Sequence, residues 1–204
     1  MPRPRAVLIW IAVATALLVP FGFAVSSPLL QWRDPVYIGS GIAGVMAMGL
    51  LLMQPLLVGG YLPGFKGISG RRLHRGVGAL LVGLVIIHVA GLWITSPPDV
   101  IDALLFMSPT PFSIWGVIAM WAVFAAALIG ALRHRMGQRL RLWRLLHTSL
   151  VSIIAIGTAL HALQIDGTME PISKGLLTAS VLGVLIWVIL DRRIWALFPL
   201  VRRK

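Results

Sequence analysis

Four of the five histidines form two equally spaced pairs, and binding a metal or a haem iron is the chemistry that this spacing suggests. His74 and His88 lie fourteen positions apart in one apolar segment, and His147 and His161 repeat the interval in another. Fourteen residues of α-helix rise about 21 Å and end about 40° short of four full turns, so each pair projects from one helix face at two depths. Two such helices side by side could bind two haems, one at each depth.

Each histidine taken alone has a simpler explanation. His88 and His161 lie deep in apolar segments, where a polar group is costly, but a single one could hydrogen-bond a neighbouring helix or belong to a proton path. His74 and His147 lie in basic surroundings and could be boundary residues, while His134, in RHR, needs no special explanation. The four together favour bis-histidine haem ligation, because zinc would need its ligands clustered at one point.

The elements that must position these histidines are membrane-spanning helices. The 204 residues are 58% apolar and 12% charged, with a mean hydropathy of +0.92, which lies outside the range of a soluble domain. A spanning helix takes about 20 apolar residues. The expected fold is an all-α membrane protein, a single domain over 1–204 built as a six-transmembrane-helix bundle, with helices near 6–25, 36–58, 74–94, 113–132, 146–163 and 175–190.

The charges separate by membrane side, although their sum is +12. Most lysines and arginines lie near the two chain ends and in the loops after the second and fourth apolar runs, whereas five of the six acidic residues fall on the other side. By the positive-inside rule both termini are cytoplasmic, and anionic lipid is a better partner than nucleic acid. The expected location is a bacterial inner membrane, crossed several times. A cleaved signal peptide is a second interpretation of the first run, whose length suits a span better.

This topology predicts which histidines face each other. The third and fifth helices run in the same direction, from the cytoplasm outward, and each begins with a histidine at the cytoplasmic boundary. His74 is therefore expected to face His147 near the inner surface, and His88 to face His161 towards the outer surface. Each pair could supply the two axial ligands of one b-type haem.

Three arginines near the inner pair could bind haem propionates, because a guanidinium suits a carboxylate. They are Arg72, Arg75 and Arg144. Anchoring to lipid headgroups is the simpler role for any one of them. The chain has no cysteine, which excludes iron–sulfur clusters and thiolate-ligated haem and leaves histidine as the expected ligand.

Two segments, RRLHRGVGALLVGLVIIHVAGL and RLWRLLHTSLVSIIAIGTALHAL, resemble the ferric reductase-like transmembrane domain family. That family includes the membrane domains of NADPH oxidases and ferric reductases and, more distantly, the haem subunit of the periplasmic methionine sulfoxide reductase system. The resemblance implies two b haems, held by His74 and His88 on the third helix and by His147 and His161 on the fifth. Most oxidases and ferric reductases continue into a flavin and nicotinamide domain, which this sequence lacks.

The expected function is transmembrane electron transfer, as an oxidoreductase or a subunit of one. A flavin reductase or a quinol would donate electrons, and a separate extracytoplasmic acceptor would receive them, since no flavin or quinone motif is recognisable. Three alternatives stay open: a haem-binding, quinol-linked subunit of a periplasmic reductase system, a cytochrome b561-type quinol oxidoreductase, and a haem-free small transporter or assembly subunit. No carboxylate lies in the middle of a span to support a proton path in the last of these.

Overall fold

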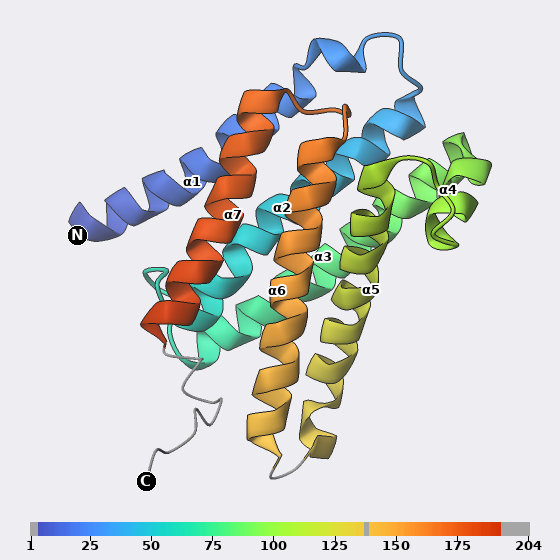
Figure 1. The fold of residues 1–204 in the computed structure, drawn as a ribbon. Coiled ribbons are helices and arrows are strands. Elements are labelled where there is room, and N and C mark those ends of the chain that lie inside the picture. Colours follow the sequence, from blue (N-terminus) through green and yellow to red (C-terminus); the bar gives the residue numbers. More distant parts are fainter. Residues whose placement is uncertain (1–3, 137–138, 193–204) are drawn as a thin grey trace, which may run out of the picture.

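A computed structural model describes residues 4–136 and 139–192 (Figure 1), and all regular structure in these ranges is helical. The order of the elements is α1 (Pro4–Val25), η1 (Pro28–Leu30), α2 (Pro35–Gly59), α3 (Ile68–Thr95), α4 (Pro97–Leu104), α5 (Pro111–Ala131), η2 (Leu132–Met136), α6 (Leu140–Gln164) and α7 (Pro171–Asp191). Every α-helix except the eight-residue α4 is long and apolar enough to cross a bilayer. The prediction of six spanning helices is therefore confirmed.

The two helices that carry the histidine pairs begin earlier than the sequence predicted. α3 begins at Ile68 and α6 at Leu140, against expected starts at 74 and 146. The arginines that precede each apolar run lower its hydropathy, but arginine and leucine are good helix formers, so the helical hydrogen bonds continue towards the membrane surface. His74 and His147 thus lie in the second turn or beyond, on backbone that is already helical.

Two antiparallel hairpins, α2 with α3 and α5 with α6, form the main body of the bundle. The helices within each hairpin pack along each other more extensively than any other pair, and α7 lies against α1, α2 and α6. In Figure 1, α5, α6 and α7 run beside one another, while α2 and α3 cross behind them at an angle. Proline in the first turn sets the helical φ angle where α2, α5 and α7 begin.

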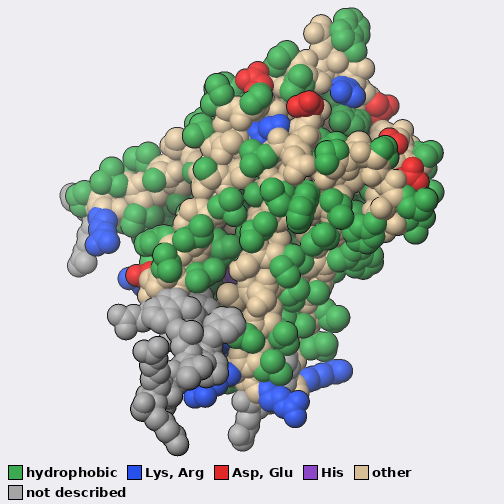
Figure 2. Space-filling view, in the orientation of Figure 1, with side chains coloured by type: hydrophobic (Ala, Val, Ile, Leu, Met, Phe, Trp, Pro, Cys, Tyr) green, Lys and Arg blue, Asp and Glu red, His purple; other side chains and the backbone are tan. Residues whose placement is uncertain are grey.

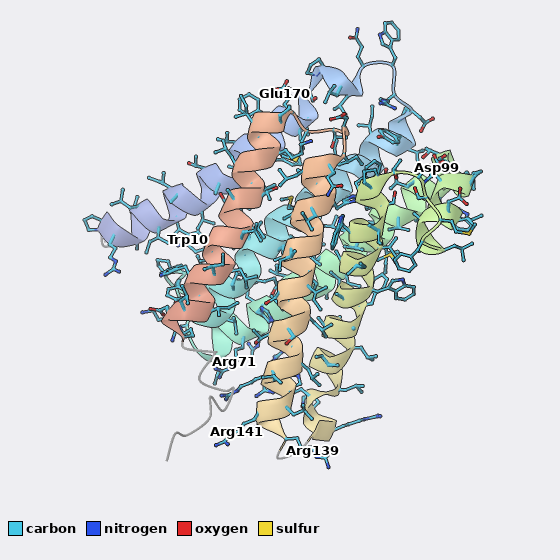
Figure 3. The ribbon with its side chains drawn as sticks, in the orientation of Figure 1. Trp10, Arg71, Asp99, Arg139, Arg141 and Glu170 are labelled. Atoms are coloured by element: carbon cyan, nitrogen blue, oxygen red, sulfur yellow. The ribbon has the colours of Figure 1, made fainter. Side chains whose placement is uncertain are left out.

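On the face shown in Figure 2, apolar side chains are frequent between the two ends of the bundle, and most charged side chains lie towards the ends (Figures 2 and 3). We call the end with Arg71, Arg139 and Arg141 the basic end, and the end with Asp99 and Glu170 the acidic end. Large apolar side chains between the ends are well exposed, among them Leu18, Leu80, Ile87, Trp121 and Leu128. A surface of this kind suits lipid tails, so the chain has the features of a multi-pass membrane protein.

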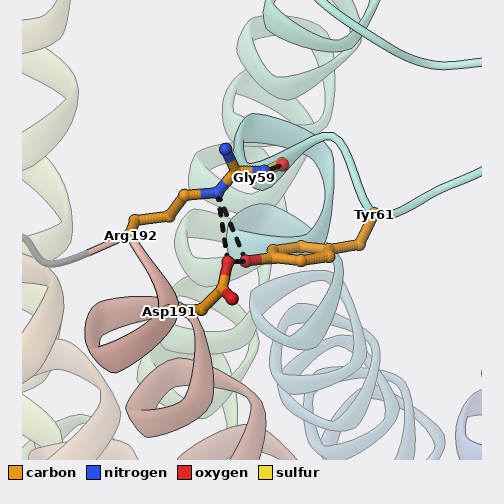
Figure 4. Close-up of polar contacts among 4 residues, drawn as sticks. All are labelled: Gly59, Tyr61, Asp191 and Arg192. Atoms are coloured by element: carbon orange, nitrogen blue, oxygen red, sulfur yellow. Dashed lines mark hydrogen bonds and ion pairs between the residues drawn. The ribbon is translucent and has the colours of Figure 1, made fainter.

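Asp191 lies at the basic end, and its contacts explain this exception to the charge pattern (Figure 4). The Tyr61 hydroxyl donates a hydrogen bond to the Asp191 carboxylate. Arg192 donates to the Tyr61 hydroxyl at 3.2 Å and to the Gly59 carbonyl. The Tyr61 ring also packs on Trp187, with 4.3 Å between ring centroids. This cluster ties the loop after α2 to the end of α7.

We expect Tyr61→Phe to lower the stability of the bundle by about 0.5–1.5 kcal/mol, the net value of one hydrogen bond. Partial burial and the hydrogen bond to Asp191 raise the pKa of Tyr61 above 10. The stabilisation is therefore complete below about pH 10 and is lost as the pH rises through the folded-state pKa. Thermal unfolding in detergent across this pH range measures both effects.

Tyr37→Phe is the matched control, because the Tyr37 hydroxyl makes no hydrogen bond within residues 4–136 and 139–192. Its stability should match that of the wild type at neutral pH. An equal loss of stability in the two variants would contradict a specific role for the Tyr61–Asp191 contact.

Candidate functional site

The four paired histidines meet across the two hairpins. The ring centroids of His74 on α3 and His147 on α6 are 6.4 Å apart, and the ring planes cross at 73°. His88 and His161, on the same two helices, are also 6.4 Å apart and cross at 80°. The structure thus places the first pair towards the basic end and the second towards the acidic end, separated by about 21 Å of helix. His134 is exposed in η2 and takes no part.

The pair nearer the acidic end is oriented by backbone carbonyls of the neighbouring helices. His88 Nδ1 donates to the Ser40 carbonyl of α2 at 2.7 Å, and His161 Nδ1 donates to the Phe112 carbonyl of α5 at 3.0 Å. A carbonyl oxygen can only accept, so the proton of each neutral ring is on Nδ1. The lone pair of Nε2 on the other side of each ring is left for a metal ion, the arrangement that histidine ligands usually show.

The pair nearer the basic end is oriented by different contacts. His74 Nδ1 donates to the Gln54 carbonyl at 3.3 Å, and the buried Gln54 amide lies against the same ring. His147 Nδ1 is buried without a hydrogen-bond partner in the described residues. The His147 ring instead stacks on Trp143, at 5.3 Å and 11°, and Trp143 Nε1 donates to the Ile129 carbonyl at 3.0 Å.

The two hairpins repeat one arrangement. On α2 the carbonyls that face histidines belong to Ser40 and Gln54, which are fourteen positions apart like the histidines themselves. On α5 the Phe112 carbonyl takes the place of Ser40, and Ala126 stands fourteen positions further along, but no hydrogen bond joins it to His147. Corresponding positions of the two hairpins are 72 or 73 residues apart in the sequence. Each hairpin therefore presents two histidines from one helix, and carbonyls of the partner helices accept hydrogen bonds from three of the four rings.

A glycine makes room for each ring of the pair nearer the acidic end. Gly44 on α2 follows Ser40 by one turn, and a Cβ there would lie 3.0 Å from His88 Nδ1. Gly116 on α5 stands in the corresponding place, where a Cβ would lie only 2.7 Å from His161 Nδ1. Both histidines hence lie directly against helix backbone, a position that a larger residue would block.

The small residues of the histidine helices could serve close packing of the helices or leave room for a macrocycle. Gly91 and Gly157 now have a packing role, because a Cβ at Gly91 would meet Ser40 and one at Gly157 would meet Trp115 and Ala119. The glycines that touch the histidine rings lie on the partner helices α2 and α5.

His88 and His161 line a cavity of about 480 Å³ between the hairpins. This volume falls in the range of sites for small molecules and cofactors. The helices α3 and α6 have sparse backbone contact with each other. The cavity wall is mostly apolar and includes Met48, Leu51, Leu81, Val85, Val123 and Ile154.

The three arginines proposed from sequence for haem propionates lie at the basic end, near the His74 and His147 pair. All three are exposed: Arg72, Arg75 and Arg144. Their exposure suits lipid headgroups, and binding to a propionate stays a prediction.

Sequence reasoning missed three kinds of supporting residue. Gly44 and Gly116 could have been found from their spacing of 72 positions, close to the 73 that separates the histidine pairs. Trp143 lies one helical turn before His147, the spacing at which side chains touch. Lys174 was visible only as one of two cations on the acidic side, and the structure buries it at 6% exposure in the cavity wall.

These residues fit a haem better than a bare metal ion. Within residues 4–136 and 139–192 no three His, Cys, Asp or Glu side chains gather at one point, as a tetrahedral metal would require. Metal–nitrogen bonds of about 2.0–2.1 Å on both sides of one iron put imidazole centroids roughly 6 to 6.5 Å apart, a range that includes both histidine pairs. Comparisons with family models, curated proteins and solved structures find no match to this chain.

Proposed function

We propose that this chain binds two b-type haems, one at each histidine pair, and carries electrons across the membrane. The observation that supports the proposal most directly is the matched geometry of the pairs: opposed imidazoles 6.4 Å apart at two depths. Three of the four rings also have Nδ1 bonded to a backbone carbonyl. The resemblance of the histidine segments to the ferric reductase-like family leads to the same proposal.

The residues of the chain would position and tune the cofactor. His88 and His161 would bind one iron from opposite faces, and their hydrogen bonds to Ser40 and Phe112 would fix the rings and increase the basicity of Nε2. The apolar cavity wall would exclude water from the ring. Haem would supply one-electron chemistry when bound, while the protein sets its potential through ligands, burial and nearby charge.

The two charged ends give the orientation proposed for the protein in the membrane. By the positive-inside rule the basic end and both termini lie in the cytoplasm of a bacterial cell. A flavin reductase or a membrane quinol would reduce the protein, and an acceptor outside the membrane would oxidise it at the acidic end. A membrane that is negative inside favours this direction by up to about 2.3 kcal/mol per 100 mV for a full crossing.

The test is the visible spectrum and the pyridine haemochrome of the protein purified from haem-replete cells, with haem counted per chain. We expect a b-type spectrum and two haems. Colourless protein would overturn the proposal and favour the haem-free transporter or assembly subunit. One haem per chain would overturn the two-site arrangement.

A further inference from the structure

Lys174, near the start of α7, is the one charged side chain that is buried among the residues whose burial the structure describes. It is 6% exposed and lines the cavity beside His161. Its Nζ donates one hydrogen bond, to the Ile165 carbonyl at the end of α6, at 2.8 Å. A lysine in this position holds a positive charge inside a largely apolar wall.

Lys174 forms no ion pair within residues 4–136 and 139–192, although Asp99 and Asp102 line the same cavity. The ion pair found there joins Arg192 to Asp191 at the opposite end of the bundle. An ammonium group has three donors, and the Ile165 carbonyl takes one of them. Because a buried charge is costly unless it is paired, a negatively charged group is the missing partner of Lys174.

The position of the ammonium group narrows the choice of anion. Ile165 follows His161 by four residues, which is about 6 Å along a helix. Because Lys174 binds the Ile165 carbonyl, its ammonium group lies about one helical turn from His161, on the side of the acidic end. A ligand between the two would need an apolar body against the cavity wall and an anionic edge at Lys174. Haem has this combination, since its flat ring is apolar and its two propionates are carboxylates.

We propose that Lys174 binds a propionate of the haem held by His88 and His161. The proposal rests on the proposed function and gives this site a positively charged anchor that the exposed arginines of the basic end cannot provide. Reduction adds one negative charge to the site, so a nearby ammonium group favours the reduced state. Loss of this charge should lower the midpoint potential of that haem.

The test is a redox titration of the full-length protein with Lys174→Met, which keeps most of the length of the side chain and removes its charge. We expect the midpoint potential of one haem to fall by about 59 mV, a tenfold change in the one-electron equilibrium. The other haem should keep its potential. Lys174→Arg should restore the wild-type value, because it returns the positive charge.

Arg33→Gln is the matched control, since Arg33 is an exposed cation on the acidic side. It should leave both potentials unchanged. Two bound haems with wild-type potentials in Lys174→Met would overturn the proposal and leave the proposed function intact. Colourless wild-type protein would overturn both. If the methionine variant does not accumulate, Lys174→Gln takes its place in the same titration.

An exchangeable anion from solution is the other possible partner of Lys174. In that case acetate or phosphate added to the wild-type protein would shift the potential of this haem, whereas a propionate bound at Lys174 makes the potential insensitive to both. A shift with added acetate or phosphate would therefore overturn the assignment to a propionate.

Discussion

Replacing His88 or His161 with alanine is expected to lower the haem content from two to one per chain. The lost haem should be the same in both variants, because the two rings face each other at 6.4 Å. Replacing His74 or His147 should remove the other haem, since these rings form the second pair. Each alanine substitution removes one of the two protein ligands of a haem, together with the side chain that packs beside the haem. Pyridine haemochrome and redox titration measure how many haems remain and which one is lost.

His134→Ala is the control for this series. His134 is exposed in η2 and faces none of the paired histidines, so the variant should keep both haems with unchanged potentials. Loss of the same haem from all four paired variants would refute the pairing by depth. Loss of both haems from every variant would indicate general misfolding, which circular dichroism and gel filtration would detect independently.

The pairing of the histidines could be predicted because it depends on the periodicity of the α-helix and on the order of the membrane spans. Helical periodicity puts residues fourteen apart on one face, and two helices with one span between them run in the same direction. The helix starts were less predictable, because arginine ends an apolar run without ending a helix. α3 accordingly begins six residues before the expected position.

The support from α2 and α5 could not be predicted from the residue types involved. Ser40, Gln54 and Phe112 act through their carbonyl oxygens, which every residue has, so nothing in the side chains marks them. The burial of Lys174 was equally hidden, because a cation near the end of a span usually lies at the membrane surface. These contacts become visible only when the packing of the helices is known.

Gly116→Ala should displace the His161 ring and weaken the haem site nearer the acidic end. The new methyl group would lie 2.7 Å from Nδ1 and 2.9 Å from Cε1 of the ring, closer than carbon atoms can approach without a shift. The ring cannot move away and keep its 3.0 Å hydrogen bond to the Phe112 carbonyl. Loss of such a supporting hydrogen bond typically weakens metal binding about 10–100-fold. Haem retention after dilution or competition with apomyoglobin measures the change.

Alanine substitutions at two further glycines distinguish displacement of the histidine ligand from general destabilisation of the bundle. Gly44→Ala should have a smaller effect, since its methyl group would lie 3.0 Å from His88 Nδ1 and a shift of a few tenths of an ångström relieves the contact. Gly83→Ala, on the same helix as His88, should retain haem like the wild type, because a Cβ there meets nothing within 4 Å. The expected order of haem loss is Gly116→Ala, then Gly44→Ala, then Gly83→Ala. Equal retention in all three would mean that the rings do not depend on these close backbone approaches, and the support assigned to α2 and α5 would be wrong.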